Sequence, residues 1–233
     1  MAGIGSRRKC EKLIIDGRVS VNGKLVTELS TRIDLAEDDV WVDGRPVVPA
    51  GKKLVLVLNK PSGVLSTVED RYRRKTVIDI AREKGYLERL FPVGRLDMDT
   101  TGLILITNDG ELAYRLTHPK FKVEKTYHVV VEGHISEQTI NRIKAGLNLK
   151  ELRTLPCRIK LLNYTSDHSE LEVTIKEGKK RQIKRMFSAF GHKVLRLHRK
   201  AIADLTFEDV DIGEIRELKE DELKRLRELV GLA

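Results

Sequence analysis

The chain has 233 residues, of which 40% are hydrophobic and 34% charged, enough for a small module followed by a larger domain with its own core. No apolar run approaches the ~20 residues that a membrane-spanning helix requires, and the N-terminus lacks the apolar stretch of a signal peptide. Cys10 and Cys157 form no C-x-x-C pair, so they offer no zinc-site spacing and fit a reducing compartment. We therefore expect a soluble, cytoplasmic protein with no membrane partner, metal or cofactor.

Positive charge is unevenly distributed along the chain. The formal net charge is +9, and residues 176–200 contain ten Lys or Arg against a single acid, Glu177. Residues 1–24 contain six basic and two acidic side chains, whereas residues 25–48 contain two basic and six acidic ones. This polarity indicates binding edges for an anionic partner, although composition alone does not separate nucleic acid from a membrane surface. A solvated charged surface is the alternative interpretation.

The first 48 residues predict a helix followed by short hairpin strands. Residues 6–15 have helical character and are ended by Gly17, a glycine just past the last turn. Residues 19–21 alternate like a strand and run into the tight-turn pair Asn22-Gly23, and residues 40–42 run into Asp43-Gly44. Residues 47–51 are the predicted linker, so the expected domains are 1–48 and 53–233.

This first module resembles the S4 RNA-binding domain, through its basic helix, the phrase "GRVSVNG" and the closing "VWVDG". That family usually has another helix before the "GSRRK" phrase, whereas only residues 1–5 precede it here. We therefore expect an abbreviated first helix or a truncated start. The resemblance implies that the basic residues of this helix and its C-terminal end bind RNA phosphates: Arg7, Arg8, Lys9, Lys12 and Arg18.

Residues 53–233 predict an α+β domain with a large, mostly antiparallel sheet and packed helices. The expected strands are short apolar or alternating runs at residues 54–58, 103–106, 127–131, 158–163 and 171–175. A helix is expected from the cap Ser136 to residue 145, and another along the apolar positions 183, 186, 187 and 190. A final helix from Glu217 should bury Leu223, Leu226 and either Leu229 or Val230.

The loop at residues 94–102 is the most informative place for chemistry. It holds Arg95, Asp97 and Asp99 directly before the apolar strand at 103–106, where partial desolvation and a nearby cation can tune a carboxylate. Three other interpretations remain open from spacing alone. The acids can simply hydrogen-bond the turn; they imitate half of a calcium loop, although its twelfth position is Asn108 rather than Glu; or they belong to a paired-carboxylate hydrolase.

Three ordered motifs resemble the family of ribosomal RNA pseudouridine synthases that includes synthase A, for the small ribosomal subunit, and synthase B, for the large one. They are "GRLDMDTTGLILITNDGELAYRLTHP" from residue 94, "KTYHVVV" from residue 125 and "EGKKRQIKRMFSAFGHKVLRLHR" from residue 177. The resemblance implies that Asp97 is the attacking carboxylate, that Tyr127 lies beside the target uridine, and that Lys184 is the cation paired with Asp97. Without it, Tyr127 would be a packed aromatic and Lys184 a surface lysine.

The same resemblance implies an enzyme that converts one uridine of ribosomal RNA to pseudouridine after base extrusion, acting as a monomer, with the large-subunit RNA favoured over the small. Arg95 is expected to help open the RNA, and Lys180, Arg181 and Arg185 to bind its phosphates. A non-catalytic RNA-binding assembly factor is the main alternative. A zinc-dependent deaminase is disfavoured because its His-x-Glu and Pro-Cys-x-x-Cys signatures are absent from the sequence.

Overall fold

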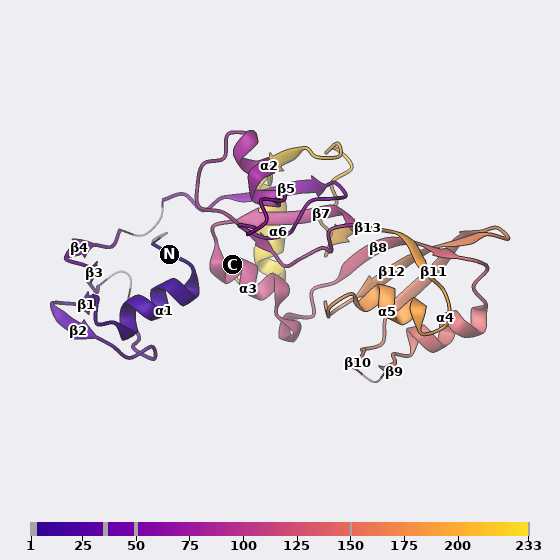
Figure 1. Cartoon of the computed structure of the whole chain (residues 1–233), viewed down its shortest axis with the longest axis horizontal. Coiled ribbons are helices and arrows are strands. Elements are labelled where there is room, and N and C mark those ends of the chain that lie inside the picture. The colour runs from indigo at the N-terminus through magenta and orange to yellow at the C-terminus, as the bar shows by residue number, and fades with distance from the viewer. Residues whose placement is uncertain (1–3, 35–36, 49–50, 150, 233) are drawn as a thin grey trace. The chain divides into compact units, whose positions relative to one another are not determined.

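A computed structural model describes the whole chain except residues 1–3, 35–36, 49–50, 150 and 233. The chain divides into two compact units, Met1–Lys53 and Leu54–Ala233 (Figure 1). Part of the predicted linker, residues 49–50, and part of the expected abbreviated start, residues 1–3, lie outside the described residues. In the part of the chain that is described, no helix is long and apolar enough to cross a membrane.

The first unit consists of one helix and a small antiparallel sheet in the order β2-β1-β3-β4. The side chain of Ser6 accepts a hydrogen bond from the Lys9 amide and so caps the helix. Both predicted tight turns are present, because the two residues at each turn have positive φ, as two-residue hairpins require. The elements are α1 (Arg7–Ile15), β1 (Val19–Val21), β2 (Lys24–Val26), β3 (Val40–Val42) and β4 (Arg45–Pro46).

The second unit is built on an eight-stranded sheet in the order β11-β12-β8-β13-β7-β5-β14, with β6 paired to β7. All neighbours are antiparallel except β13 and β7, whose parallel pairing covers two residues of each strand. The strands are β5 (Val55–Lys60), β6 (Phe91–Val93), β7 (Thr101–Thr107), β8 (Lys125–Glu132), β11 (Arg158–Tyr164), β12 (His168–Ile175), β13 (Val194–Ile202) and β14 (Ile215–Glu217). A separate ribbon pairs β9 (Asn148–Leu149) with β10 (Leu152–Arg153).

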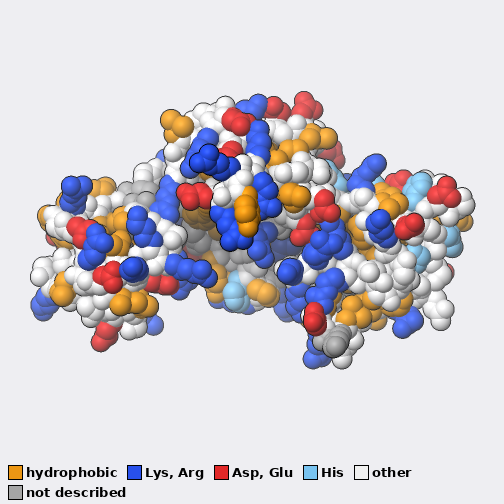
Figure 2. Space-filling view, in the orientation of Figure 1, with side chains coloured by type: hydrophobic (Ala, Val, Ile, Leu, Met, Phe, Trp, Pro, Cys, Tyr) orange, Lys and Arg blue, Asp and Glu red, His pale blue; other side chains and the backbone are white. Residues whose placement is uncertain are grey.

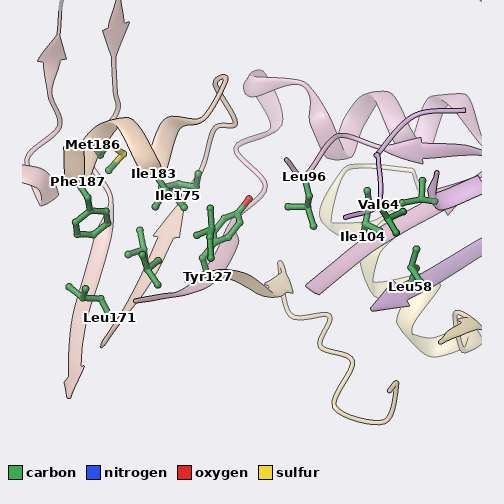
Figure 3. Close-up of a cluster of buried hydrophobic side chains, with 14 of the residues drawn as sticks. Leu58, Val64, Leu96, Ile104, Tyr127, Leu171, Ile175, Ile183, Met186 and Phe187 are labelled. Carbon is green, nitrogen blue, oxygen red and sulfur yellow. The ribbon is translucent and has the colours of Figure 1, made fainter. Parts of the chain in front are cut away.

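Helices cover both faces of this sheet and bury two apolar clusters. On one face lie α2 (Val77–Glu83), α4 (Glu137–Lys144) and α5 (Gln182–Ser188), packed on the alternate strand residues that include Tyr127 (Figure 3). On the other lie α3 (Gly110–Thr117) and α6 (Glu220–Leu229), with the short 3₁₀ turn Pro119–Phe121 following α3. The fold is therefore α+β with a large, mostly antiparallel sheet, as predicted.

Several predicted elements begin or end at other residues than expected. The last helix begins at Glu220, because Glu217 belongs to β14. Of the two alternatives at its end, Val230 is buried, whereas Leu229 is 54% exposed. Helix α5 ends at Ser188, so Phe190 packs on the core from beyond the helix. The short strands β6 and β14 and the helix α2 were not anticipated, because their few apolar residues show no clear period.

Candidate active site

The loop that carries Asp97 connects β6 to β7 and is held by hydrogen bonds within itself and from a second segment. The Thr100 amide donates to the Asp97 carbonyl oxygen at 3.0 Å, which closes a tight turn. Ser66 Oγ donates to the Leu96 carbonyl oxygen at 3.0 Å and accepts from the Leu96 amide at 3.1 Å. The backbone on both sides of Asp97 is thus fixed, which restricts where its carboxylate can point.

Lys60, the last residue of β5, anchors the same loop from beneath. Its side chain is fully buried, and Nζ donates to the carbonyl oxygens of Pro61 at 3.0 Å, Met98 at 3.1 Å and Thr100 at 2.8 Å. Burial lowers the pKa of this amine to about 8, while the nearby Asp99 and Asp97 carboxylates act in the opposite direction. Three carbonyl acceptors therefore hold an ammonium group directly under the acidic loop.

Asp97 and Tyr127 line one pocket. Its volume is about 80 Å³, and its walls come from the acidic loop, β8, the end of β12 and the start of α5. Tyr127 is only 8% exposed. Figure 3 shows it between Ile175 and Ile183 on one side and Leu96 on the other, with its hydroxyl group directed toward Leu96. Arg95 and Arg181 add two cationic side chains to the lining.

Lys184 interacts with both carboxylates of the loop. Its side chain is 12% exposed, and Nζ lies 3.7 Å from Asp97 Oδ2 but 2.5 Å from Asp99 Oδ1. The hydrogen bond from Lys184 holds the pKa of the Asp99 carboxyl below its usual range. The predicted partner of Asp97 therefore stands within ion-pair distance of it, while its closest contact is with the more exposed acid two residues later.

The start of α5, which positions Lys184, depends on a buried polar pair. Glu177 and Gln182 are 5% and 4% exposed, and Gln182 Nε2 donates to Glu177 Oε1 at 2.8 Å. The same oxygen accepts the Leu155 amide at 2.8 Å. Arg181, the residue before the helix, has a left-handed backbone with φ 51°. The only acid of the basic segment 176–200 is thus a buried structural group.

The residues expected to bind RNA are distributed over both units. In the first unit, α1 carries four of them: Arg7, Arg8, Lys9 and Lys12. Arg7 is almost fully exposed and pairs with Glu11. Arg18 instead makes a two-pronged ion pair with Asp43, at 2.7 and 2.5 Å.

In the second unit, Lys180 is exposed, and Arg181 lines the pocket. Arg185 lies 3.8 Å from the carboxylate of Glu151. Figure 2 shows that Lys and Arg side chains gather over the middle of this unit on the face that is drawn. Of the basic residues of segment 176–200, Lys179 and Arg181 line the pocket that holds Asp97, and Lys184 lies 3.7 Å from the Asp97 carboxylate.

Sequence reasoning overlooked the residues that support the site. Lys60 stood in a group of turn-forming residues, and Ser66 and Gln182 had no pattern of their own. Their hydrogen-bond partners lie 38 to 40 residues away for Lys60 and 30 residues away for Ser66. The one available signal for Lys60 was a lysine placed directly after five consecutive apolar residues and an asparagine.

Comparisons with known proteins identify the family of each unit. A family model described as RNA pseudouridylate synthase matches residues 54–189, and an S4 domain model matches residues 1–40. An uncharacterized RNA pseudouridine synthase of Aquifex aeolicus (strain VF5) is 43% identical over 99% of this chain and 92% of its own. The ribosomal large subunit pseudouridine synthase B of Bacillus subtilis (strain 168) is 42% identical over 98% and 93%.

A solved structure shows the same fold over nearly the whole chain. A crystal structure of a pseudouridylate synthase superposes with a TM-score of 0.69 at 31% identity, covering 97% of this chain and 95% of the other. The family model spans more than half of the chain, and two relatives exceed 40% identity over almost all of it. The chain therefore belongs to the RNA pseudouridylate synthase family and carries an S4 domain at its N-terminus.

Proposed function

We propose that this enzyme isomerises a specific uridine of large-subunit ribosomal RNA to pseudouridine, with Asp97 as its nucleophile. One observation supports the site above all others: Asp97 and Tyr127 line a single pocket, with the Lys184 ammonium 3.7 Å from the Asp97 carboxylate. Support for the large-subunit RNA comes from the name of the Bacillus subtilis relative. The alternatives are the same reaction on small-subunit RNA and a non-catalytic assembly factor.

The proposed chemistry needs few groups. The reaction breaks the N1–C1′ bond of uridine, turns the detached uracil and joins C5 to C1′, while C5 loses a proton and N1 gains one. An ionised carboxylate is required as the nucleophile, and the Lys184 ammonium lies 3.7 Å from the carboxylate of Asp97. We assign Tyr127 to the face of the extruded base, as a candidate for moving the C5 proton, and Arg95 to opening the RNA.

The loop before α2 offers a further RNA contact. Tyr72 is 63% exposed, and the guanidinium groups of Arg71 and Arg74 lie over its ring at 4.6 and 5.3 Å from the centroid. Asp70 accepts hydrogen bonds from the Arg74 side chain, which lowers its pKa to about 2. Exposed aromatic and guanidinium planes suit unstacked bases, and Ser66 at the start of this loop is bonded to Leu96 beside Asp97.

The test compares two matched substitutions in one loop. Asp97→Asn should abolish tritium release from rRNA labelled at uridine C5, a loss of at least ~10³-fold, because the nucleophile is removed. Asp99→Asn removes the same charge from a 63% exposed side chain and should keep activity within about tenfold, because Lys184 is then free to pair with Asp97. RNA binding should survive in both. Tritium release by Asp97→Asn would refute the nucleophile assignment.

A second measurement identifies the substrate. Chemical mapping of pseudouridine on both ribosomal RNAs, treated with the native enzyme or with Asp97→Asn, should give one Asp97-dependent position in the large-subunit RNA. A modified nucleotide in the small-subunit RNA instead would show that this RNA is the substrate. Binding without any modification would favour the assembly factor. A cytoplasmic location and a monomeric state accompany this proposal as predictions.

A further inference from the structure

The outer side of α3 and the 3₁₀ turn after it carry aromatic and basic side chains close together. Leu112 and Leu116 are the buried residues of this helix. Tyr114 lies midway between them in sequence, hence on the opposite side of the helix, and is 43% exposed. A single exposed apolar side chain is ordinary. This one belongs to a group that we name the aromatic–basic cluster: Tyr114, His118, Lys120 and Phe121.

Ring contacts hold the cluster in one arrangement. The ring centroid of Tyr114 lies 5.0 Å from that of His118 and 6.0 Å from that of Phe121, which it meets edge to face. Phe121 is itself packed on the second apolar cluster of the core, and the Arg115 guanidinium lies over its ring at 5.5 Å from the centroid. The exposed tyrosine ring is therefore positioned before any partner arrives, which reduces the entropy cost of binding to it.

The 3₁₀ turn adds a positive charge and a hydrogen-bond donor. Lys120 Nζ lies over the rings of Tyr114 and Phe121, at 5.3 and 4.7 Å from their centroids. His118 Nδ1 accepts the Lys120 amide at 3.2 Å, so the neutral imidazole carries its proton on Nε2. Within the described part of the chain, neither Lys120 nor the exposed Lys122 forms an ion pair with an acid. This surface thus suits an anionic partner that has a flat ring.

The cluster adjoins the loop that carries Asp97. Helix α3 packs against β6, the strand that leads into this loop. A Cβ atom added to Gly94 would lie only 3.4 Å from Thr117 Cγ2, so the last residue of α3 packs on the start of the loop. The next residue, Arg95, is exposed and lines the Asp97 pocket. On its other side, the 3₁₀ turn leads into β8, which carries Tyr127.

We propose that the aromatic–basic cluster binds an unpaired nucleotide that flanks the target uridine in the same RNA strand. Its base would stack on the exposed side of the Tyr114 ring, the Lys120 ammonium would pair with a phosphate, and His118 Nε2 would donate to an oxygen of the nucleotide. Such platforms suit single strands because every base has a π face and every nucleotide a phosphate. This site rests on the proposed function for the identity of its RNA, and it would hold the strand while the uridine is extruded.

Filter binding of the full chain to a large-subunit rRNA transcript, with excess tRNA as competitor, tests the ring. Tyr114→Leu keeps an apolar side chain but removes the aromatic plane, and should weaken binding about tenfold because one stacked base is lost. Tyr114→Phe keeps the plane and should bind within about twofold of the native chain. Tyr164→Leu is the matched control and should bind like the native chain. Tyr164 is 57% exposed and its ring lies 4.7 Å from that of His134, but among the described residues no cation lies over it.

Two further measurements test the charge and the place of contact. Lys120→Gln should reduce the slope of log K against log salt by about 0.7, because one phosphate contact with a single strand is lost. Lys160→Gln, at an exposed position of β11, should leave the slope unchanged. Hydroxyl-radical footprinting with Tyr114→Leu should show protection lost over one contiguous stretch of RNA, adjacent to the nucleotide that the native chain modifies.

Native-like RNA binding by a folded Tyr114→Leu variant would overturn the proposal, as would equal losses in Tyr114→Leu and Tyr164→Leu. Weaker binding to an assembling large subunit, with unchanged binding to naked rRNA, would overturn it too and assign the cluster to a protein partner. If circular dichroism shows that Tyr114→Leu does not fold, the two lysine variants decide, and equal salt slopes contradict the proposal. RNA binding is measured without isomerisation, so this site and the role of Asp97 can fail separately.

Discussion

At the scale of single residues, the molecule depends on polar groups that are buried and fully bonded. Lys60 and Glu177 are charged residues inside the second unit, and each binds backbone groups of loops next to the pocket. Neither takes part in the proposed reaction. Their effect is to restrict the position of Asp97 and Lys184, which is what catalysis by a positioned carboxylate requires.

Lys60→Met should therefore reduce both stability and activity. The substitution removes the Lys60 donor from three carbonyl oxygens, of which only that of Met98 keeps a second donor among the described residues, the Gly63 amide. We expect the free energy of unfolding to fall by about 3 kcal/mol. Loosening of the Asp97 loop should lower kcat by about 100-fold. Urea denaturation and tritium release measure the two effects. Lys193→Met, at an exposed position, is the control, and an equal effect in both variants would contradict the anchoring role.

The same lysine should give stability a characteristic dependence on pH. The pKa of Lys60 is lowered from 10.5 to about 8 in the folded chain. Between these values the unfolded chain holds a proton that the folded chain has lost, so stability rises with pH. Relative to Lys60→Met, the native chain should gain up to about 3 kcal/mol between pH 7.5 and 10.5. Lys125, with a similarly lowered pKa, titrates in both proteins and cancels. If the difference in unfolding free energy between the native chain and Lys60→Met did not change with pH over this range, this interpretation would be refuted.

The positions of residues around the pocket were predictable from the sequence only where a motif was continuous. Asp97 stands in a recognisable loop, and Tyr127 and Lys184 stand in two later motifs of matching order. The close contact of Lys184 with Asp99 was not predictable, because it depends on how α5 approaches the loop across 85 residues of sequence. The role of Gln182 was not predictable either, because nothing in the sequence shows that its partner Glu177 is buried.

At the scale of elements, the parallel pairing of β7 with β13 covers two residues of each strand, and Gly102 is one of them. Gly102 has φ +101°, and a Cβ atom added to it would collide with the backbone of Arg199. This contact joins the part of the sheet formed by β5, β6 and β7 to the part formed by β8, β11 and β12. Only a glycine fits at this position.

Gly102→Ala should accordingly cost at least about 3 kcal/mol of unfolding free energy, because both the steric clash and the backbone strain must be relieved. Gly133→Ala is a matched control: it has φ +74° but no heavy atom within 4 Å of the added Cβ. We expect it to cost only about 1 kcal/mol. Thermal or urea denaturation would measure both. Similar losses of unfolding free energy in the two variants would show that backbone strain, rather than the close approach of β13, determines the cost of replacing Gly102.

The elements with strong local signals were the ones that the sequence predicted well. The hairpin pairs Asn22-Gly23 and Asp43-Gly44 carry their turn geometry in two residues, and the apolar runs of β5 and β7 are buried on both sides. The three-residue strands β6 and β14 have no such signal. They exist because β7 and β5 offer open edges to pair with, which is a property of the assembled sheet.

At the scale of the whole molecule, the two units differ in how they are stabilised. Among the described residues of the first unit, only Leu13 and Val19 are buried apolar side chains, whereas the second unit contains two extensive apolar clusters. A unit with so small a core is marginally stable by itself. We propose that its exposed basic side chains on α1 bind RNA.

The salt dependence of RNA binding should reveal this role. Replacing Arg8 and Lys12 on α1 with alanine should reduce the slope of log K against log salt by about 1.5, because two phosphate contacts are lost. Replacing Arg32 and Arg45, which are exposed in the acidic part of the same unit, removes equal charge and should change the slope by less than about 0.5. Filter binding at several salt concentrations measures both, and equal slopes would argue against a binding edge on α1.

The anchoring of the Asp97 loop also affects how freely this protein can change over evolutionary time. Lys60 is bonded to main-chain oxygens of Pro61, Met98 and Thr100, and every amino acid provides such an oxygen. The Met98 side chain is itself 46% exposed. Position 98 can therefore accept different side chains while the hydrogen bond from Lys60 continues to hold the backbone beside Asp97.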